Sequence, residues 1–67
     1  MKAGAIIHEN GLHWVSREGP GHFKVWEVTG VASYRRGTYH FSSRPEYALE
    51  RAIGDCNRRE QTRLAAV

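Results

Sequence analysis

Short segments rich in β-branched and aromatic residues alternate with glycines over the first 42 residues of the chain. The glycines at positions 11, 21, 30 and 37 fall between these segments, at the spacing expected of strands joined by tight turns. We therefore predict five antiparallel strands. They run approximately over Ala3 to Glu9, Leu12 to Arg17, His22 to Val28, Val31 to Arg35 and Thr38 to Ser42.

Two-residue turns fix the register that we expect for these strands. Asn10-Gly11 suits a type I′ hairpin, because Asn and Gly are the residues least penalised at positive φ. We also expect two-residue turns at Thr29-Gly30 and Arg36-Gly37. The resulting pairs are Val28 with Val31 and Arg35 with Thr38.

In this register, side-chain alternation gives the last three strands an apolar face and a polar face. The apolar face carries Phe23, Val25, Ala32, Tyr34, Tyr39 and Phe41, with Glu27 as the exception. The other face carries Lys24, Trp26, Val28, Val31, Ser33, Arg35, Thr38, His40 and Ser42. A three-residue loop with a glycine bulge at Thr29-Gly30 is the alternative, and it would exchange the two faces, so that Trp26 joins the core. We favour the first register because its core face is more uniformly apolar.

A helix is predicted after the last strand. Ser43-Arg44-Pro45-Glu46 has the Ser-x-x-Glu form of a capping box, with proline in the first turn. The apolar residues Leu49, Ala52, Ile53, Cys56, Leu64 and Val67 then fall on one helical stripe. Gly54 interrupts the helix at a cost of about 1 kcal/mol relative to Ala, and Asp55 is able to cap a restarted segment, so a kink is expected here.

These elements predict one α+β domain over residues 1–67. An antiparallel meander of four to five strands occupies residues 3–42, and a C-terminal helix over residues 43–66 packs on one face of the sheet. The chain has 67 residues, of which 40% are apolar and 25% charged, which fits one small soluble domain. Chains of this length bury a small core, so good turns, a homodimer or another partner must add stability.

A single cysteine, Cys56, excludes an internal disulfide framework and a cysteine-based zinc site. We expect it to be a small buried side chain, with a reactive thiol as the alternative. No apolar stretch approaches the roughly 20 residues that cross a bilayer, so no membrane partner is expected. These observations predict a cytoplasmic protein.

The sequence supplies little that points to catalysis or metal binding. A turn at Asn10-Gly11 would place His8 directly opposite His13, but a metal site requires three or four ligands and Glu9 points to the other face. No glycine elbow presents a serine, and Gly19-Pro20-Gly21 lacks the Lys-Ser/Thr ending of a phosphate loop. We therefore expect no enzymatic activity, no metal and no other cofactor.

The formal net charge of +3 favours acidic partners, and the cations gather in two patches. The sheet patch comprises Trp26 with Lys24, Arg35, Arg36 and His40. The helix patch comprises Arg58, Arg59 and Arg63. An aromatic side chain among cations is typical of single-strand nucleic-acid binding and equally of protein–protein hot spots. The alternatives are that Trp26 covers a second part of the core and that the arginines form a solvated helix face.

The three strands and helix between Phe23 and Arg59 resemble the DNA-binding domain of the AP2 and tyrosine-integrase arm-binding type. This resemblance implies that the outer face of the sheet lies in the major groove of DNA. The residues that would carry this contact are Lys24, Trp26, Ser33, Arg35 and His40.

The whole chain also resembles the short single-domain accessory proteins of phages and mobile elements, among them anti-CRISPR proteins. The resemblance rests on size, on the order of meander and helix, on the lack of catalytic groups and on the lone cysteine. It implies stoichiometric binding to a host protein or nucleoprotein complex in a bacterial cytoplasm. We therefore predict a non-enzymatic modulator or inhibitor of a host factor that acts through the two patches, with direct nucleic-acid binding as the alternative.

Overall fold

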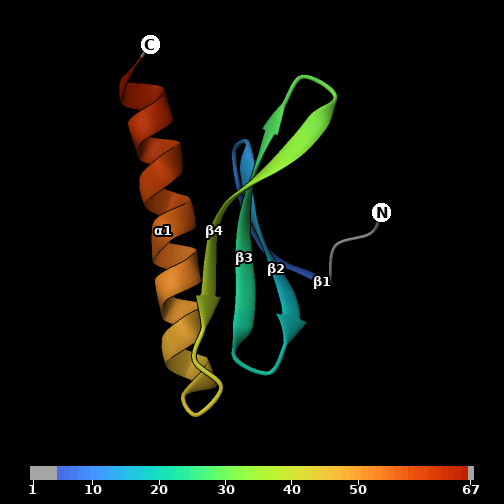
Figure 1. The fold of residues 1–67 in the computed structure, drawn as a ribbon. Helices are drawn as coiled ribbons and strands as arrows, with labels where there is room; N and C mark the ends of the chain where they lie inside the picture. The colour runs from blue at the N-terminus through green and yellow to red at the C-terminus, as the bar shows by residue number, and fades with distance from the viewer. Residues whose placement is uncertain (1–4, 67) are drawn as a thin grey trace.

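Residues 5–66 are described by a computed structural model, in which a four-stranded antiparallel sheet packs on one helix (Figure 1). The elements are β1 Ala5–Asn10, β2 His13–Gly19, β3 His22–Thr29, β4 Ala32–His40 and α1 Pro45–Ala65. The strand order is β1-β2-β3-β4, so each strand pairs with its neighbours in sequence. The predicted α+β class is confirmed. Ala3 and Gly4, at the predicted start of the first strand, and Val67, in the predicted apolar stripe, lie outside the described residues.

The fourth and fifth predicted strands are one strand in the structure. The predicted turn at Arg36-Gly37 is wrong, because β4 continues through both residues. Gly37 pairs with Val25, and Arg35 pairs with Trp26, which leaves Arg36 as the extra residue of a β-bulge. The glycine therefore marks an irregularity inside a strand rather than the end of one.

Two of the predicted turns lie one residue later than expected. Asn10 pairs with His13, and Thr29 pairs with Ala32, so Gly11-Leu12 and Gly30-Val31 are the central residues. In both turns the glycine comes first and has positive φ, at 61° and 63°, as a type II′ turn requires. The predicted pairing of Val28 with Val31 is consequently wrong. The predicted pairing of Arg35 with Thr38 is wrong because both residues belong to the same strand, β4.

The predicted faces of β3 and β4 are nevertheless correct. Moving a two-residue turn by one position shifts every cross-strand partner by two, and a shift of two keeps each side chain on the same face. Phe23 lies opposite Tyr39 on the inner face, whereas Trp26 lies opposite Arg35 on the outer face. The alternative register, with Trp26 in the core, is wrong.

The core lies between the inner face of the sheet and α1. Its buried hydrophobic side chains are Val15, Phe23 and Val25 from the sheet and Ala48, Ala52 and Cys56 from the helix. Tyr39 and Leu49 pack against them. Tyr34 is 51% exposed although it belongs to the inner face, because the tip of the β3–β4 hairpin bends away from α1 (Figure 1). Phe41 is also exposed, so the predicted core face is too long at both ends.

The helix differs from its prediction in three ways. It runs without interruption from Pro45 to Ala65, so the kink predicted at Gly54 is wrong. Its N-cap is Arg44 and no side chain caps it, so the capping box is wrong as well, although proline does occupy the first turn. The buried stripe comprises Ala48, Ala52, Asp55, Cys56 and Glu60, whereas Leu64, from the predicted stripe, is 57% exposed.

Candidate functional site

The face of the sheet opposite α1 is covered by no other element among residues 5–66 and forms the candidate site. We call it the open face. Cross-strand register and alternation place on it Ile6 and Glu9 of β1, Trp14 and Ser16 of β2, His22, Lys24, Trp26 and Val28 of β3, and Ser33, Arg35, Thr38 and His40 of β4. One broad face of this molecule therefore consists of side chains that the fold leaves without a covering layer.

Two tryptophans occupy the centre of the open face. Trp14 of β2 lies directly opposite Trp26 of β3, and these are the two inner strands of the sheet. Their rings stack with centroids 5.2 Å apart and planes 10° from parallel. Both side chains are partly buried, since each indole has one ring face against the other. The stack is a rigid aromatic ridge rather than two independent rings.

Two linked hydrogen bonds fix the position of the Trp26 indole in this ridge. The Trp26 Nε1–H donates to Ser16 Oγ at 2.9 Å, and the Ser16 hydroxyl donates to Glu18 Oε2 at 2.5 Å. Ser16 is fully buried even though it belongs to the open face, because neighbouring side chains cover it. The indole N–H is thus satisfied inside the protein, which leaves the apolar part of Trp26 for contact with a partner.

Charges of both signs flank the aromatic ridge. The row across the sheet reads Glu9, Trp14, Trp26, Arg35, with the carboxylate on β1 and the guanidinium on β4. Lys24 adds a second cation, and Glu18 adds a second carboxylate beside Ser16. The open face therefore has a balanced charge rather than a cationic excess.

Four of the five residues of the predicted sheet patch lie on the open face, and the β-bulge separates them from the fifth. Lys24, Trp26, Arg35 and His40 lie together on the open face, where His40 stacks on His22 with ring centroids 4.4 Å apart. Arg36 does not join them. As the bulged residue it turns to the helix side, where its Nε donates to Glu27 Oε1 at 2.9 Å.

Trp14 and Glu9 were not predicted from the sequence as members of this site. Both occupy alternate positions on strands whose partners depend on the first turn. The signal was available for Trp14, because period-2 alternation from Val15 inward puts it on the same face as Ser16. It was available for Glu9 as well, because alternation counted from the first turn puts Glu9 on the face opposite His8.

The three arginines of the helix patch are all engaged by carboxylates of their own helix. Arg58 and Arg59 both donate to Asp55, whose side chain is almost fully buried, and the Arg59 Nε lies 3.1 Å from its Oδ2. Arg63 donates to Glu60 through Nε and Nη2. The patch carries cations, but each is paired at close range, so its capacity to neutralise phosphates is reduced.

Glu60 is the centre of a second buried cluster, at the first hairpin. Its carboxylate accepts hydrogen bonds from the Leu12 N–H at 3.1 Å, from Arg63, and from His13, whose Nδ1 lies 2.8 Å away. The hydrogen bonds from Arg63 and His13 lower the pKa of Glu60 to about 2 from its ordinary value of 4.5. This carboxylate is therefore ionised under all ordinary conditions and ties α1 to the turn between β1 and β2.

The predicted opposition of His8 and His13 is wrong. His8 lies opposite Val15, because the turn is one residue later and the partner of His8 therefore shifts by two. Its Nε2 lies 3.0 Å from Asn57 Oδ1, which also accepts a hydrogen bond from Asn10 Nδ2. In the described part of the chain, no group of three or more His, Cys, Asp and Glu side chains is placed to hold a metal ion.

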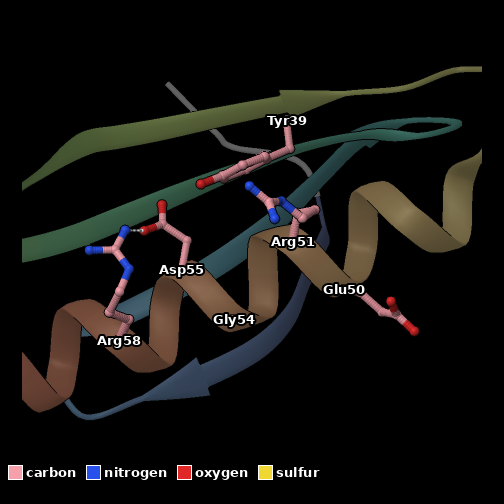
Figure 2. Close-up of a pocket in the computed structure, with 6 residues that line it drawn as sticks. All are labelled: Tyr39, Glu50, Arg51, Gly54, Asp55 and Arg58. Carbon is pink, nitrogen blue, oxygen red and sulfur yellow. Dashed lines mark hydrogen bonds and ion pairs between the residues drawn. The ribbon is translucent and has the colours of Figure 1, made fainter.

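A shallow groove runs between β4 and α1 where Gly54 leaves the helix backbone bare (Figure 2). Tyr39 and Arg51 point into it, Glu50 points away, and Asp55 turns toward Arg58. Burial and the nearby Asp55 carboxylate raise the pKa of Tyr39. The groove thus presents the Tyr39 phenol beside the ion pair of Asp55 and Arg58.

Cys56 lies in the core with no exposed surface. Burial raises the pKa of its thiol, and the carboxylates of Glu60 and Asp55 raise it further. A thiol in such surroundings is a poor nucleophile. The expected buried role of Cys56 is the one that the structure supports.

Comparisons with known proteins add no relative: no protein-family model, no curated protein and no solved structure matches this chain. Across residues 5–66, α1 is the sole helix, and it is not apolar enough over its length to cross a membrane.

Proposed function

We propose that this chain is a non-enzymatic binding protein that docks on another protein through the open face of its sheet. The observation that carries the proposal is the stacked pair of Trp14 and Trp26 at the centre of an uncovered face. Tryptophan and arginine dominate the energetics of protein interfaces, and hot spots lie near the centre of an interface with a polar rim around them. The open face has this arrangement, with Arg35 and Glu9 at its margins.

Two features of the open face favour a protein partner over nucleic acid. Nucleic-acid binding depends on a local excess of cations, whereas here Lys24 and Arg35 are balanced by Glu9 and Glu18. Single-strand binders also stack bases on free aromatic faces, whereas Trp14 and Trp26 each use one ring face on the other. The paired arginines of the helix patch argue in the same direction.

The resemblance to phage accessory proteins specifies this proposal further. It makes the partner a host protein or nucleoprotein complex and makes the binding modulatory or inhibitory. The open face supplies a surface with which such a protein could bind stoichiometrically and without a cofactor.

Oligonucleotide titration tests the choice between protein and nucleic acid. Anisotropy is measured with labelled duplex and single-stranded DNA at low and at moderate salt. We expect no binding at moderate salt and weak, non-specific binding at most at low salt. Salt-steep binding that is lost in Trp26→Ala or Arg35→Glu would refute a protein-only role for the open face, because it would show phosphate contacts there.

A capture experiment from host cells tests the docking itself. The wild-type chain, Trp26→Ala and Tyr34→Ala are each used as bait. Tyr34 is the matched control, because it is an exposed aromatic residue on the opposite face of the same hairpin. We expect a protein partner that is retained by wild type and by Tyr34→Ala and lost by Trp26→Ala. If Trp26→Ala loses the partner because the surface has changed, and not because the chain is misfolded, then Arg35→Glu, a substitution of an exposed residue, should lose the partner too.

A further inference from the structure

We infer that one partner of the open face is a second copy of this chain, packed face to face about a two-fold axis that runs parallel to the strands between β2 and β3. The inference rests on the proposed function, because it names an occupant for the same face. It follows from the order of charges across the sheet, from the size of the face and from the size of the core.

The central row of the open face is self-complementary. It reads Glu9, Trp14, Trp26, Arg35 from β1 to β4. A two-fold axis parallel to the strands reverses this order in the facing copy. Glu9 then meets Arg35 of the second copy at each edge, and Trp14 meets Trp26 at the centre. An isologous interface requires this kind of match, in which residue i contacts residue j and j contacts i.

The next row supports the same symmetry. It reads Ile6, Ser16, Lys24, Thr38 from β1 to β4. The axis brings Lys24 opposite Ser16 of the second copy, where the Glu18 carboxylate is hydrogen-bonded to the Ser16 hydroxyl. Each lysine thus faces a carboxylate, and the charges of the two rows are complementary rather than repulsive.

The face is large enough for a stable interface. The molecule measures 38 by 26 by 14 Å, and the sheet forms its broad side. Stable protein interfaces bury about 800 Å² on each partner, which the central part of a face of these dimensions can supply. Face-to-face packing of two sheets would give four layers, with the two helices outermost.

The small hydrophobic core explains why dimerisation would stabilise this chain. Three of the six buried hydrophobic side chains are Ala48, Ala52 and Cys56, which contribute little apolar area each. Domains of this size commonly gain stability from oligomerisation, disulfides or metals. A second copy would bury the Trp14–Trp26 ridge and form a second apolar layer on the far side of the sheet. A host protein that binds the same face would have to compete with that copy.

Sedimentation equilibrium with charge-reversed variants tests the inference. The wild-type chain should show a concentration-dependent monomer–dimer equilibrium. Glu9→Arg and Arg35→Glu should each raise the dimer dissociation constant by roughly tenfold or more, because each places like charges together at both edges of the interface. Both residues are exposed, and circular dichroism checks that each variant is folded. Glu50→Arg, an exposed reversal on α1, is the control and should leave the dimer unchanged.

The decisive experiment is to mix Glu9→Arg with Arg35→Glu. In a heterodimer of Glu9→Arg with Arg35→Glu, both edges again pair opposite charges, so dimerisation should return. A wild-type chain that stays monomeric at roughly 1 mM, a dimer that neither reversal weakens, or a mixture that stays monomeric would each overturn the inference. If the wild-type chain is monomeric but captures a protein that Trp26→Ala does not capture, the inference of a second copy is wrong and the proposed function stands. Salt-steep oligonucleotide binding through Trp26 would instead refute the proposed function.

Discussion

His13 and Glu60 lie 47 positions apart in the chain, and their Nδ1 and Oε1 atoms lie 2.8 Å apart in the structure. The contact is buried and joins the first hairpin to the last turns of α1. It also shows why the C-terminal part of the helix packs on the sheet although its apolar stripe ends early. A network of ionic hydrogen bonds replaces apolar contacts there, with Arg63 as its third member.

This network predicts an acid-dependent loss of stability. The pKa of Glu60 is lowered to about 2 in the folded chain, whereas the unfolded chain has the ordinary value of 4.5. The unfolded state therefore binds a proton more readily, and the free energy of unfolding should fall as the pH drops from about 4.5 toward about 2. Glu60→Gln should be less stable than wild type at neutral pH and should lose less over this window. Urea unfolding at several pH values measures both effects.

Glu50→Gln is the matched control, because Glu50 is an exposed carboxylate on the same helix. Its pH dependence should follow that of wild type. If Glu60→Gln shows the full wild-type loss of stability between pH 4.5 and 2, the carboxylate does not hold the lowered pKa that the network implies.

The first turn gives a second prediction, based on a comparison of two glycines. Gly11 and Gly30 both have positive φ and both come first in a two-residue turn. A Cβ at Gly30 would meet no atom within 4 Å, so Gly30→Ala should cost about 1–3 kcal/mol from backbone strain alone. A Cβ at Gly11 would overlap the Glu60 carboxylate, so Gly11→Ala should cost clearly more. Equal losses in denaturant unfolding would show that Glu60 does not lie over the turn.

The support of the aromatic ridge gives a third prediction. Ser16→Ala leaves the Trp26 Nε1–H without its acceptor and should lower the free energy of unfolding by about 1–3 kcal/mol. It should also weaken the exciton-coupled circular dichroism signal of the stacked indoles. Ser33→Ala is the control, because Ser33 is exposed on the same face, and it should change stability by less than about 0.5 kcal/mol. An unchanged indole signal in Ser16→Ala would mean that the hydrogen bond does not position Trp26.

The continuous helix gives a fourth prediction. Gly54 lies in the interior of α1, is exposed, and has no atom within 4 Å of the place a Cβ would take. Gly54→Ala should therefore raise the free energy of unfolding by about 1 kcal/mol. Thermal unfolding followed by circular dichroism measures the change. A destabilised Gly54→Ala chain would mean that the helix bends at this residue after all.

The class of fold and the two faces of the sheet follow from the sequence because alternation is insensitive to the exact turn. A turn that moves from Thr29-Gly30 to Gly30-Val31 shifts partners by two, and Phe23 stays inward while Trp26 stays outward. Lys24, Trp26 and Arg35 could therefore be placed on the correct face without the correct pairs. His40 also lies on the predicted face, because the bulge at Arg36 shifts the alternation of β4 as the predicted turn at Arg36-Gly37 would have done.

The bulges were not predicted, and they decide the details of the site. Arg36 and Ile7 each become an extra residue in a strand, which turns Arg36 toward Glu27 and puts Ile6 on the open face. Alternation counted along the chain fails at each such position. Gly37 is a local signal beside Arg36, but nothing local in the sequence marks Ile7 as bulged.

The burial of two acidic residues on α1 was also beyond sequence reasoning. Asp55 and Glu60 interrupt the apolar stripe, and carboxylates are almost never fully buried without partners. Asp55 is buried with Arg58 and Arg59 of its own helix as partners. Glu60 is buried because its partners come from elsewhere, with the Leu12 N–H and His13 reaching it from the sheet. Such partners become visible once the hairpin and the helix are placed together.

Amide chemical shifts on dilution test most directly whether the open face binds a second copy of this chain. Two-dimensional NMR spectra of the wild-type chain are recorded from high to low concentration. Our account predicts concentration-dependent shifts for Glu9, Trp14, Trp26 and Arg35, including the two indole N–H signals, and constant shifts for the exposed residues of α1. Shifts that map to α1 and leave the open face unchanged would contradict it.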